Sequence, residues 1–364
     1  MNRKIYVTAI LFLGSVLGLI GVVIYLSQGN FNSLFNVIHT IEFCSQIGTR
    51  YCDTVTKGFY ALFIWSLLFL PATLLLERLF PVNVNQKMFS IGFHQDFMWY
   101  LLGRVFRYTG SALYSMMLYT IYNTYLSGLR IQYIQQLPVA AQVMMVILGV
   151  DFLAWFSHMI RHRVSIFWEF HKLHHSQREM SFFSHWRLHP VDGLINQTIV
   201  FIPLASLQLD IAIPTFLAWN FFRQWTNMFY HANIKTDLGW LRYMIVTPQS
   251  HRIHHSLEED HFDKNFADVF SIWDYIFGTQ HRKYDEYPET GIVDPNFPLE
   301  YSPALKDVIV TAYKQLIYPF TQIHFFRHAA ASQPQSMPSA LHPTASSWSA
   351  AHHSPAEVVS QDQP

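Results

Sequence analysis

Charged side chains are scarce in this 364-residue chain. They make up 13% of the sequence, against roughly 25% in soluble globular domains, whereas 51% of the residues are hydrophobic. The 24 basic and 24 acidic residues cancel, so no basic field is available to attract nucleic acid. The composition therefore excludes an ordinary soluble protein and a nucleic-acid-binding protein, and it indicates a membrane protein.

Cysteine is almost absent. The two cysteines, Cys44 and Cys52, lie in a polar stretch after the first apolar segment, far along the chain from the histidine motifs described below. We therefore expect no cysteine among the ligands of a metal. If this stretch faces an oxidising compartment, the pair can form a disulfide, and otherwise both remain free thiols. The sequence leaves these two alternatives open.

Long apolar runs, in contrast, are frequent. Residues 5–26 carry no charge and follow Arg3 and Lys4, and a helix of about 20 residues crosses the hydrocarbon core of a bilayer. No small-x-small cleavage site follows, so we interpret this run as a signal anchor rather than a cleaved signal peptide. Further spans are expected over residues 59–76, over 108–129 and from Pro138 past Asp151, and a membrane hairpin is expected over 194–209 and 211–222.

Basic residues in the short loops set the expected orientation. The positive-inside rule places them in the cytosol: Arg3, Lys4, Arg78, Lys87, Arg104, Arg107, Arg161, Arg163 and Lys172. The histidine motifs lie among these loops, so a site built from them should face the cytosol at the membrane surface.

Composition divides the chain into four expected parts. Residues 1–135 hold N-terminal spans and loops, 136–285 the histidine-rich segment with its hairpin, and 286–327 a cap with a helix near 303–318. The tail, 328–364, is rich in Ala, Ser, Pro, Gln and His, and we expect it to be disordered. The expected fold is all-α: a polytopic helical membrane bundle with a cytosolic helical cap that carries a histidine-rich dimetal site.

Three histidine boxes dominate the chemistry of the sequence. They read His158-Met-Ile-Arg-His162, His171-Lys-Leu-His174-His175 and His251-Arg-Ile-His254-His255. Residues three and four apart share one face of a helix, so each box aims two or three imidazoles to one side. A tetrahedral ion takes four ligands, so eight clustered imidazoles predict two ions. Neutral imidazole suits borderline metals such as iron and zinc.

Two common metal motifs are missing from these boxes. Met159 follows His158, which excludes the HExxH of zinc proteases, and the Glu-x-x-His pairs of carboxylate-rich di-iron bundles are absent from the boxes. Asp151 is expected on the same helical face as His158 and His162. It either accepts an N–H bond from a ligating imidazole or is a hydrated residue at a helix end, and the sequence does not decide between these roles.

The run from Asp151 to Gly278 resembles the fatty acid hydroxylase/sterol desaturase superfamily of integral membrane di-iron enzymes. HMIRH, HKLHH and HRIHH match its three histidine boxes. The stretch SHWRLHPVDG, residues 184–193, is similar to a segment of sterol C5-desaturases. DKNF at 263–266 and IWDYIFGT at 272–279 resemble the closing signature of the family.

The resemblance implies a di-iron centre that activates O2 and removes hydrogen from an unactivated C–H bond of a lipid. It adds His231 as a further ligand and His189 as a weaker candidate, with His185 weaker still. The expected ligand set is His158, His162, His171, His174, His175, His189, His231, His251, His254 and His255.

Other polar residues of this region are assigned less specific roles. Asp192, Asp263 and Asp274 are expected either to accept N–H bonds from ligating rings or to serve as surface and helix-cap residues. We treat His94, His261 and His281 as ordinary histidines. No cytochrome b5-like haem segment is visible, so the resemblance implies a separate reductant of ferredoxin or cytochrome b5 type.

The substrate class and the outcome stay open. A sterol, a fatty acyl chain or an ether lipid would suit the family, and hydroxylation and desaturation need the same oxidised metal site. The alternative is a non-catalytic metal-binding membrane protein or a metal transporter. We disfavour it because the histidines cluster beside the spans rather than along a path through them, and because all eight box histidines are present.

Overall fold

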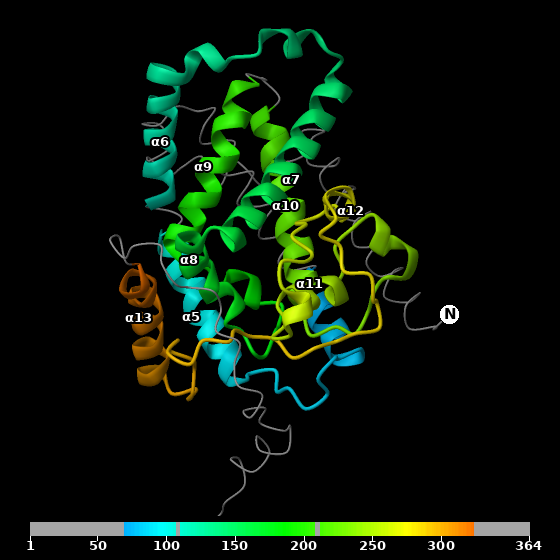
Figure 1. Ribbon diagram of the computed structural model, residues 1–364, viewed down its shortest axis with the longest axis vertical. Helices are drawn as coiled ribbons and strands as arrows, with labels where there is room; N and C mark the ends of the chain where they lie inside the picture. The colour runs from blue at the N-terminus through cyan, green and yellow to red at the C-terminus, as the bar shows by residue number, and fades with distance from the viewer. Residues whose placement is uncertain (1–68, 107–109, 208–211, 324–364) are drawn as a thin grey trace, which may run out of the picture. The chain divides into compact units, whose positions relative to one another are not determined.

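The computed structural model describes residues 69–106, 110–207 and 212–323 (Figure 1). Within these ranges the chain forms helices and turns, and its strand-like pairing is limited to one isolated bridge between Ser256 and Thr290. The expected all-α class is therefore confirmed for the described part. The expectations for the first span, for Cys44 and Cys52, for most of the second span and for the tail lie outside the described residues.

One helix in the described ranges, α7 (Val139–Arg163), is long and apolar enough to cross a membrane. It begins directly after Pro138 and ends with Arg161, His162 and Arg163 in its last turn, where cations are favoured by the helix dipole. The third expected span is instead broken into α6 (Ala112–Ile121), a π-helical turn (Tyr122–Leu126) and a 3-10 turn (Ser127–Leu129). A polytopic bundle therefore remains a proposal.

Helix α7 is the element around which its neighbours pack. Val164 is extended and lets the chain turn back into α8 (Ser165–His175), and both α9 (Pro190–Ser206) and α10 (Ala212–His231) also contact α7. Figure 1 shows α7, α9 and α10 together in the upper part of the view. Their contact is apolar, with Val146, Val150, Val200, Trp219 and Val269 buried in one cluster. Residues 208–211, at the turn of the expected hairpin, lie outside the described ranges.

A second group of helices packs beside α8 and the turn Ser184–Trp186. The chain is helical over residues 69–79, followed by α5 (Ile91–Phe106), and α13 (Leu305–Gln322) packs against α5. The helix expected near 303–318 is thus confirmed. Trp99 is buried between these helices and donates its indole N–H to Gln315 Oε1 at 2.7 Å.

The remaining elements are short. Helix α11 (Pro248–His254) begins with a capping box between Thr247 and Ser250, and α12 (Ile272–Phe277) ends at Gly278, whose φ of 73° suits a residue without a Cβ. Single 3-10 turns complete the described part: Gln132–Gln136, Ser184–Trp186, Gly239–Tyr243 and Glu259–His261.

Candidate metal centre

Four helices deliver the histidines, and each does so from its last turns. His162 lies in the last turn of α7, His174 and His175 in that of α8, His231 in that of α10, and the third box in that of α11. The carboxyl end of a helix carries about half a negative charge. Four such ends around one site therefore favour cations there.

Nine histidines form two groups whose ligand atoms lie within 4.8 Å of one another inside each group. The first histidine group is His158, His162, His171, His175 and His254, and the second is His174, His231, His251 and His255. Histidines that are adjacent in the sequence belong to different groups. His174 and His175 are divided in this way, and so are His254 and His255. The rings of His175 and His255 stack at 4.2 Å, which places the two groups side by side.

Backbone carbonyls fix the tautomers of several rings. His158 Nδ1 lies 2.9 Å from the carbonyl of Phe266, His254 Nδ1 lies 2.8 Å from that of Lys264, and His231 Nδ1 lies 2.7 Å from that of Asn227. A carbonyl only accepts, so each Nδ1 carries the proton and each Nε2 presents a lone pair. These carbonyls have no side-chain signature, which is why the sequence did not reveal them.

The bare nitrogens face one another, and this fits a bound cation. The Nε2 atoms of His158 and His254 are 3.0 Å apart, although neither has a proton to share. In the same group the Nε2 atoms of His162, His171 and His175 are buried without a hydrogen-bond partner among the described residues. Two opposed lone pairs and three orphaned nitrogens are costly in a buried site unless a positive ion lies between them.

Burial also keeps the rings neutral. It lowers the pKa of His171, His174, His175, His251 and His255 well below 6.5, with the neighbouring imidazoles acting in the same direction. Burial lowers the pKa of His254 to about 4. At neutral pH these imidazoles therefore carry no charge, which is the form that binds a metal.

Asp192 is a carboxylate in contact with His171, a member of the first histidine group. Its Oδ2 lies 3.2 Å from His171 Nδ1 and accepts from Arg161 Nη1 at 2.8 Å, and the aspartate is buried. It occupies the position that orients an imidazole from behind. Asp263, in contrast, is half exposed and 3.7 Å from Arg163, so the surface alternative holds for this residue.

Asp151 and Asp274 act on the backbone rather than on the rings. Asp151 accepts from the N–H groups of Val269 and Phe270, and Asp274 from those of Phe266 and Ala267. They also accept from indoles, Asp151 from Trp273 and Asp274 from Trp155. Of the alternatives that the sequence left open, contact with an imidazole does not hold for either aspartate, and neither is a hydrated surface residue, because both are buried. They hold the segment whose Phe266 carbonyl orients His158.

His189 and His185 lie outside both histidine groups. His189 caps α9, since its Nδ1 accepts from the N–H of Val191 at 3.1 Å, and its Nε2 lies 3.0 Å from the carbonyl of Leu316. Both of its ring nitrogens are thus engaged elsewhere. His185 is held by the Phe182 carbonyl and by Gln224, each at 3.2 Å.

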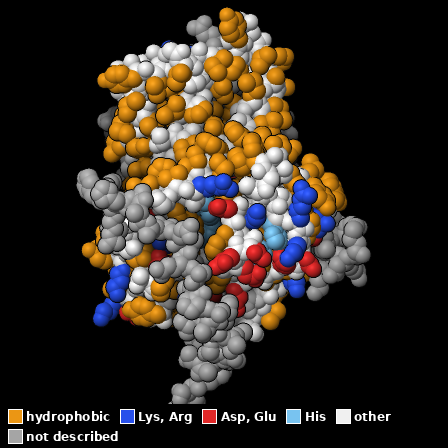
Figure 2. Space-filling view, in the orientation of Figure 1, with side chains coloured by type: hydrophobic (Ala, Val, Ile, Leu, Met, Phe, Trp, Pro, Cys, Tyr) orange, Lys and Arg blue, Asp and Glu red, His pale blue; other side chains and the backbone are white. Residues whose placement is uncertain are grey.

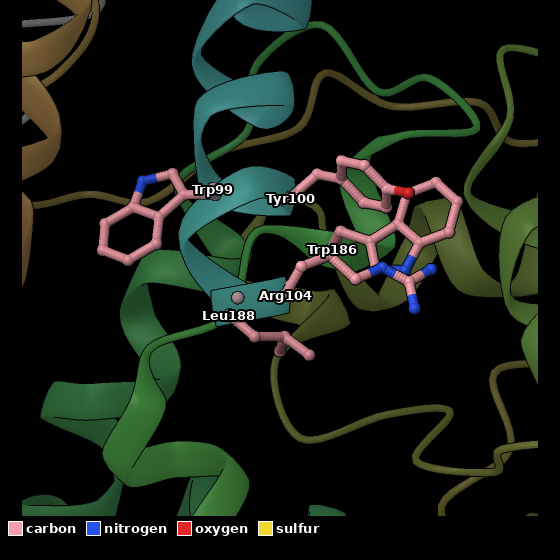
Figure 3. Close-up of a pocket in the computed structure, with 6 residues that line it drawn as sticks. Trp99, Tyr100, Arg104, Trp186 and Leu188 are labelled. Carbon is pink, nitrogen blue, oxygen red and sulfur yellow. The ribbon is translucent and has the colours of Figure 1, made fainter. Parts of the chain in front are cut away.

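An open pocket lies next to His185. Its cavity volume is only about 30 Å³, and its lining includes Trp99, Tyr100, Arg104, Trp186 and Leu188. Tyr100, Trp186 and Arg104 point to one side of α5, whereas Trp99 points to the other (Figure 3). The rings of Trp186 and His185 are in contact, with centroids 3.9 Å apart and planes tilted by 43°. Small-molecule sites usually have roughly 300–1,000 Å³, so a cavity of about 30 Å³ is far too small for a lipid.

The contact of Asp192 with His171 leads to a prediction. Asp192→Asn should weaken metal binding about 10–100-fold, because the amide cannot match a carboxylate as acceptor for the ring and for Arg161. Metal content after dialysis against a graded chelator would measure this. The matched control is Asp263→Asn at the exposed aspartate, and equal metal retention in the two variants would contradict the role of Asp192.

The chain resembles known lipid enzymes over the histidine region. Residues 143–279 match the fatty acid hydroxylase family. Human alkylglycerol monooxygenase is 34% identical over 132 residues, which is 36% of this chain and 29% of that protein. A Rhizobium tropici ornithine lipid hydroxylase is 30% identical over 147 residues, covering 40% of this chain and 44% of the relative. Methylsterol monooxygenase 1 of Rattus norvegicus is 28% identical over 134 residues, covering 36% and 44%.

These similarities concern one segment of each protein. The matched stretch spans less than half of the length of each of these three relatives. No solved structure matches the chain. All nine clustered histidines fall within residues 143–279. The expected resemblance to the fatty acid hydroxylase/sterol desaturase superfamily is therefore confirmed for residues 143–279, the segment that carries the histidines.

Proposed function

We propose that this chain is a membrane-bound, non-haem di-iron oxygenase that acts on a lipid. The observation that carries the proposal is the pair of buried histidine groups in which Nε2 atoms of different rings face one another. Nine of the ten histidines expected from the sequence make up the proposed ligand set, and His189 is left out because its nitrogens are engaged elsewhere. Two iron ions held there would supply O2 activation and hydrogen removal from a C–H bond.

The residues of the chain contribute position and charge. Neutral imidazoles bind the metals without adding negative charge, so four helix ends and Asp192 supply the compensating negative potential. The carbonyls of Phe266, Lys264 and Asn227 hold three rings in one tautomer. Eight of the nine histidines are buried and His162 is partly buried, so bulk water is kept away from the reacting centre.

A lipid substrate is supported by the apolar surface around the upper helices. Leu113, Met116 and Tyr119 of α6 and Val139 and Met144 of α7 are exposed. Figure 2 shows hydrophobic side chains over this upper region, with charged side chains gathered below it. We place the apolar region in the bilayer and the metal centre on its cytosolic side, within a multi-pass chain. A separate ferredoxin- or cytochrome b5-type protein would deliver electrons.

The named relatives favour insertion of oxygen over desaturation. They are called monooxygenases and hydroxylases, acting on alkylglycerol, on ornithine lipid and on methylsterol. We therefore propose hydroxylation as the outcome, on a sterol, an acyl chain or an ether lipid. The proposed catalytic segment is 136–285, between spans at 1–135 and a cap at 286–327, with residues 328–364 as a tail.

Untargeted lipid mass spectrometry would test the function. Cells that produce the wild-type chain should contain a lipid with one added oxygen that is missing from cells producing His174→Ala at the same level. His94→Ala is the matched control, since His94 lies outside both histidine groups and bonds to the Ser90 carbonyl. If the wild-type cells instead contained a lipid that had lost two hydrogens, the reaction would be desaturation rather than hydroxylation. Identical lipid profiles for wild type and His174→Ala would overturn the proposed activity.

A further inference from the structure

Three side chains outside both histidine groups converge in the loop that follows the third box. His261, His281 and Glu286, here called the loop triad, place one ligand atom each within 4.8 Å of the others. Glu286 Oε2 lies 2.8 Å from His281 Nε2 and 3.2 Å from His261 Nε2. The two rings are nearly perpendicular, with centroids 4.7 Å apart. Both imidazoles thus aim the same nitrogen at one carboxylate oxygen.

We propose that the loop triad is a third metal site, structural in role, that binds a zinc ion through His261, His281 and Glu286. Zinc accepts imidazole nitrogen and carboxylate oxygen, and three protein ligands leave its fourth tetrahedral position for water. With bonds of about 2.0–2.1 Å, the edges of such a tetrahedron are about 3.3 Å long. The observed separations of 2.8 and 3.2 Å need to lengthen by only tenths of an ångström.

The surroundings of the triad suit a ligand role. His261 is 3% exposed and its Nδ1 lies 2.9 Å from Ser256 Oγ. When the serine hydroxyl accepts the Nδ1 proton, Nε2 is left bare and directed at Glu286, which is the usual arrangement behind a ligating histidine. Lys283 Nζ lies 3.1 Å from Glu286 Oε1, so it engages the other carboxylate oxygen and leaves Oε2 to the rings. Glu286 is 32% exposed, which gives an ion and a water access to the site.

A metal here would close a loop directly behind the third box. Ser256 pairs with Thr290, Leu257 donates to the Glu289 carbonyl, and Gly291 donates to the carbonyl of His255. The triad joins residue 261 near the start of this loop to residues 281 and 286 near its end. Zinc would therefore brace the backbone that carries His255, at a site separate from the proposed oxygen chemistry.

Zinc stoichiometry of the purified full-length protein in detergent tests the proposal. After loading with Zn²⁺ alone and removal of unbound ion, the wild type should hold one zinc more per chain than His281→Ala or Glu286→Gln. Glu259→Gln, at an exposed carboxylate of the same loop, should match the wild type. Equal zinc content in wild type and both triad variants would overturn the third site and leave Glu286 as a simple acceptor for two imidazole N–H groups.

Two further measurements separate this site from the main centre. His174→Ala should lose metal from the second histidine group and keep the zinc of the loop triad, so failure of the di-iron proposal and failure of this one give different stoichiometries. Glu286→Gln removes a ligand charge with almost no change of shape, so it remains informative if His281→Ala does not fold. Added zinc should raise the Tm of the wild type more than that of Glu286→Gln, and an equal rise would count against the site.

Discussion

His254→Ala should abolish turnover and release metal from the first histidine group, while the chain still folds and enters the membrane. The His254 ring lies within 4.7 Å of those of His158, His162 and His175, measured between centroids, so it faces three other rings of its group. Loss of a residue that merely orients a ligand costs about 10–100-fold in metal affinity, and loss of the ligand itself should cost more. Activity in detergent and metal content on the same preparation would measure both effects.

His189→Ala is the most informative control for this experiment. The sequence placed His189 among the ligands, whereas the structure shows it capping α9. Its loss should cost about 1 kcal/mol of stability through the missing cap and leave metal content unchanged. If His189→Ala lost metal while His254→Ala kept it, the grouping of the histidines would be wrong.

The box spacing was sufficient to predict the helices but not the division of the rings between ions. Residues three and four apart share a helical face, so α7, α8 and α11 follow from the sequence. Neighbours such as His174 and His175 are turned by about 100° from each other, and this is how one box serves two groups. Which ion each ring would bind depends on how the ends of four helices pack together. This packing involves residues far apart in the sequence, so no local pattern predicts it.

Long-range partners explain the other differences. Asp151 shares a helical face with His158, as its spacing indicates. Its carboxylate, however, accepts from the N–H groups of Val269 and Phe270, which lie more than a hundred residues away in the sequence. The loop triad likewise has no helical spacing that would reveal it. It forms because the chain returns to Ser256 at Thr290 and brings Glu286 back to His261. A sequence pattern within one segment does not predict such a contact between distant parts of a loop.

Replacement of Arg187 is expected to lower the stability of the folded protein strongly. This residue is fully buried and donates to Asp96 at 2.6 Å and to both carboxylate oxygens of Glu300 at 3.0 and 3.1 Å. It also donates to Ser176 Oγ, at the end of the helix that carries the second box. Arg187→Met should destabilise the protein by about 3–5 kcal/mol, because two carboxylates then remain buried without their cation.

The pH dependence of this loss distinguishes a missing charge from poor packing. Burial raises the pKa of Asp96 to about 6 even though Arg187 acts to lower it, so without Arg187 the pKa should rise further. The folded variant then binds a proton that the unfolded chain, with a carboxyl pKa near 4, does not hold. Its stability deficit relative to wild type should therefore shrink as the pH falls from 8 to 5, whereas a packing defect would be independent of pH. Thermal unfolding in detergent across this range, with the exposed Lys314→Met as control, measures the deficit, and a constant difference in Tm would refute the electrostatic explanation.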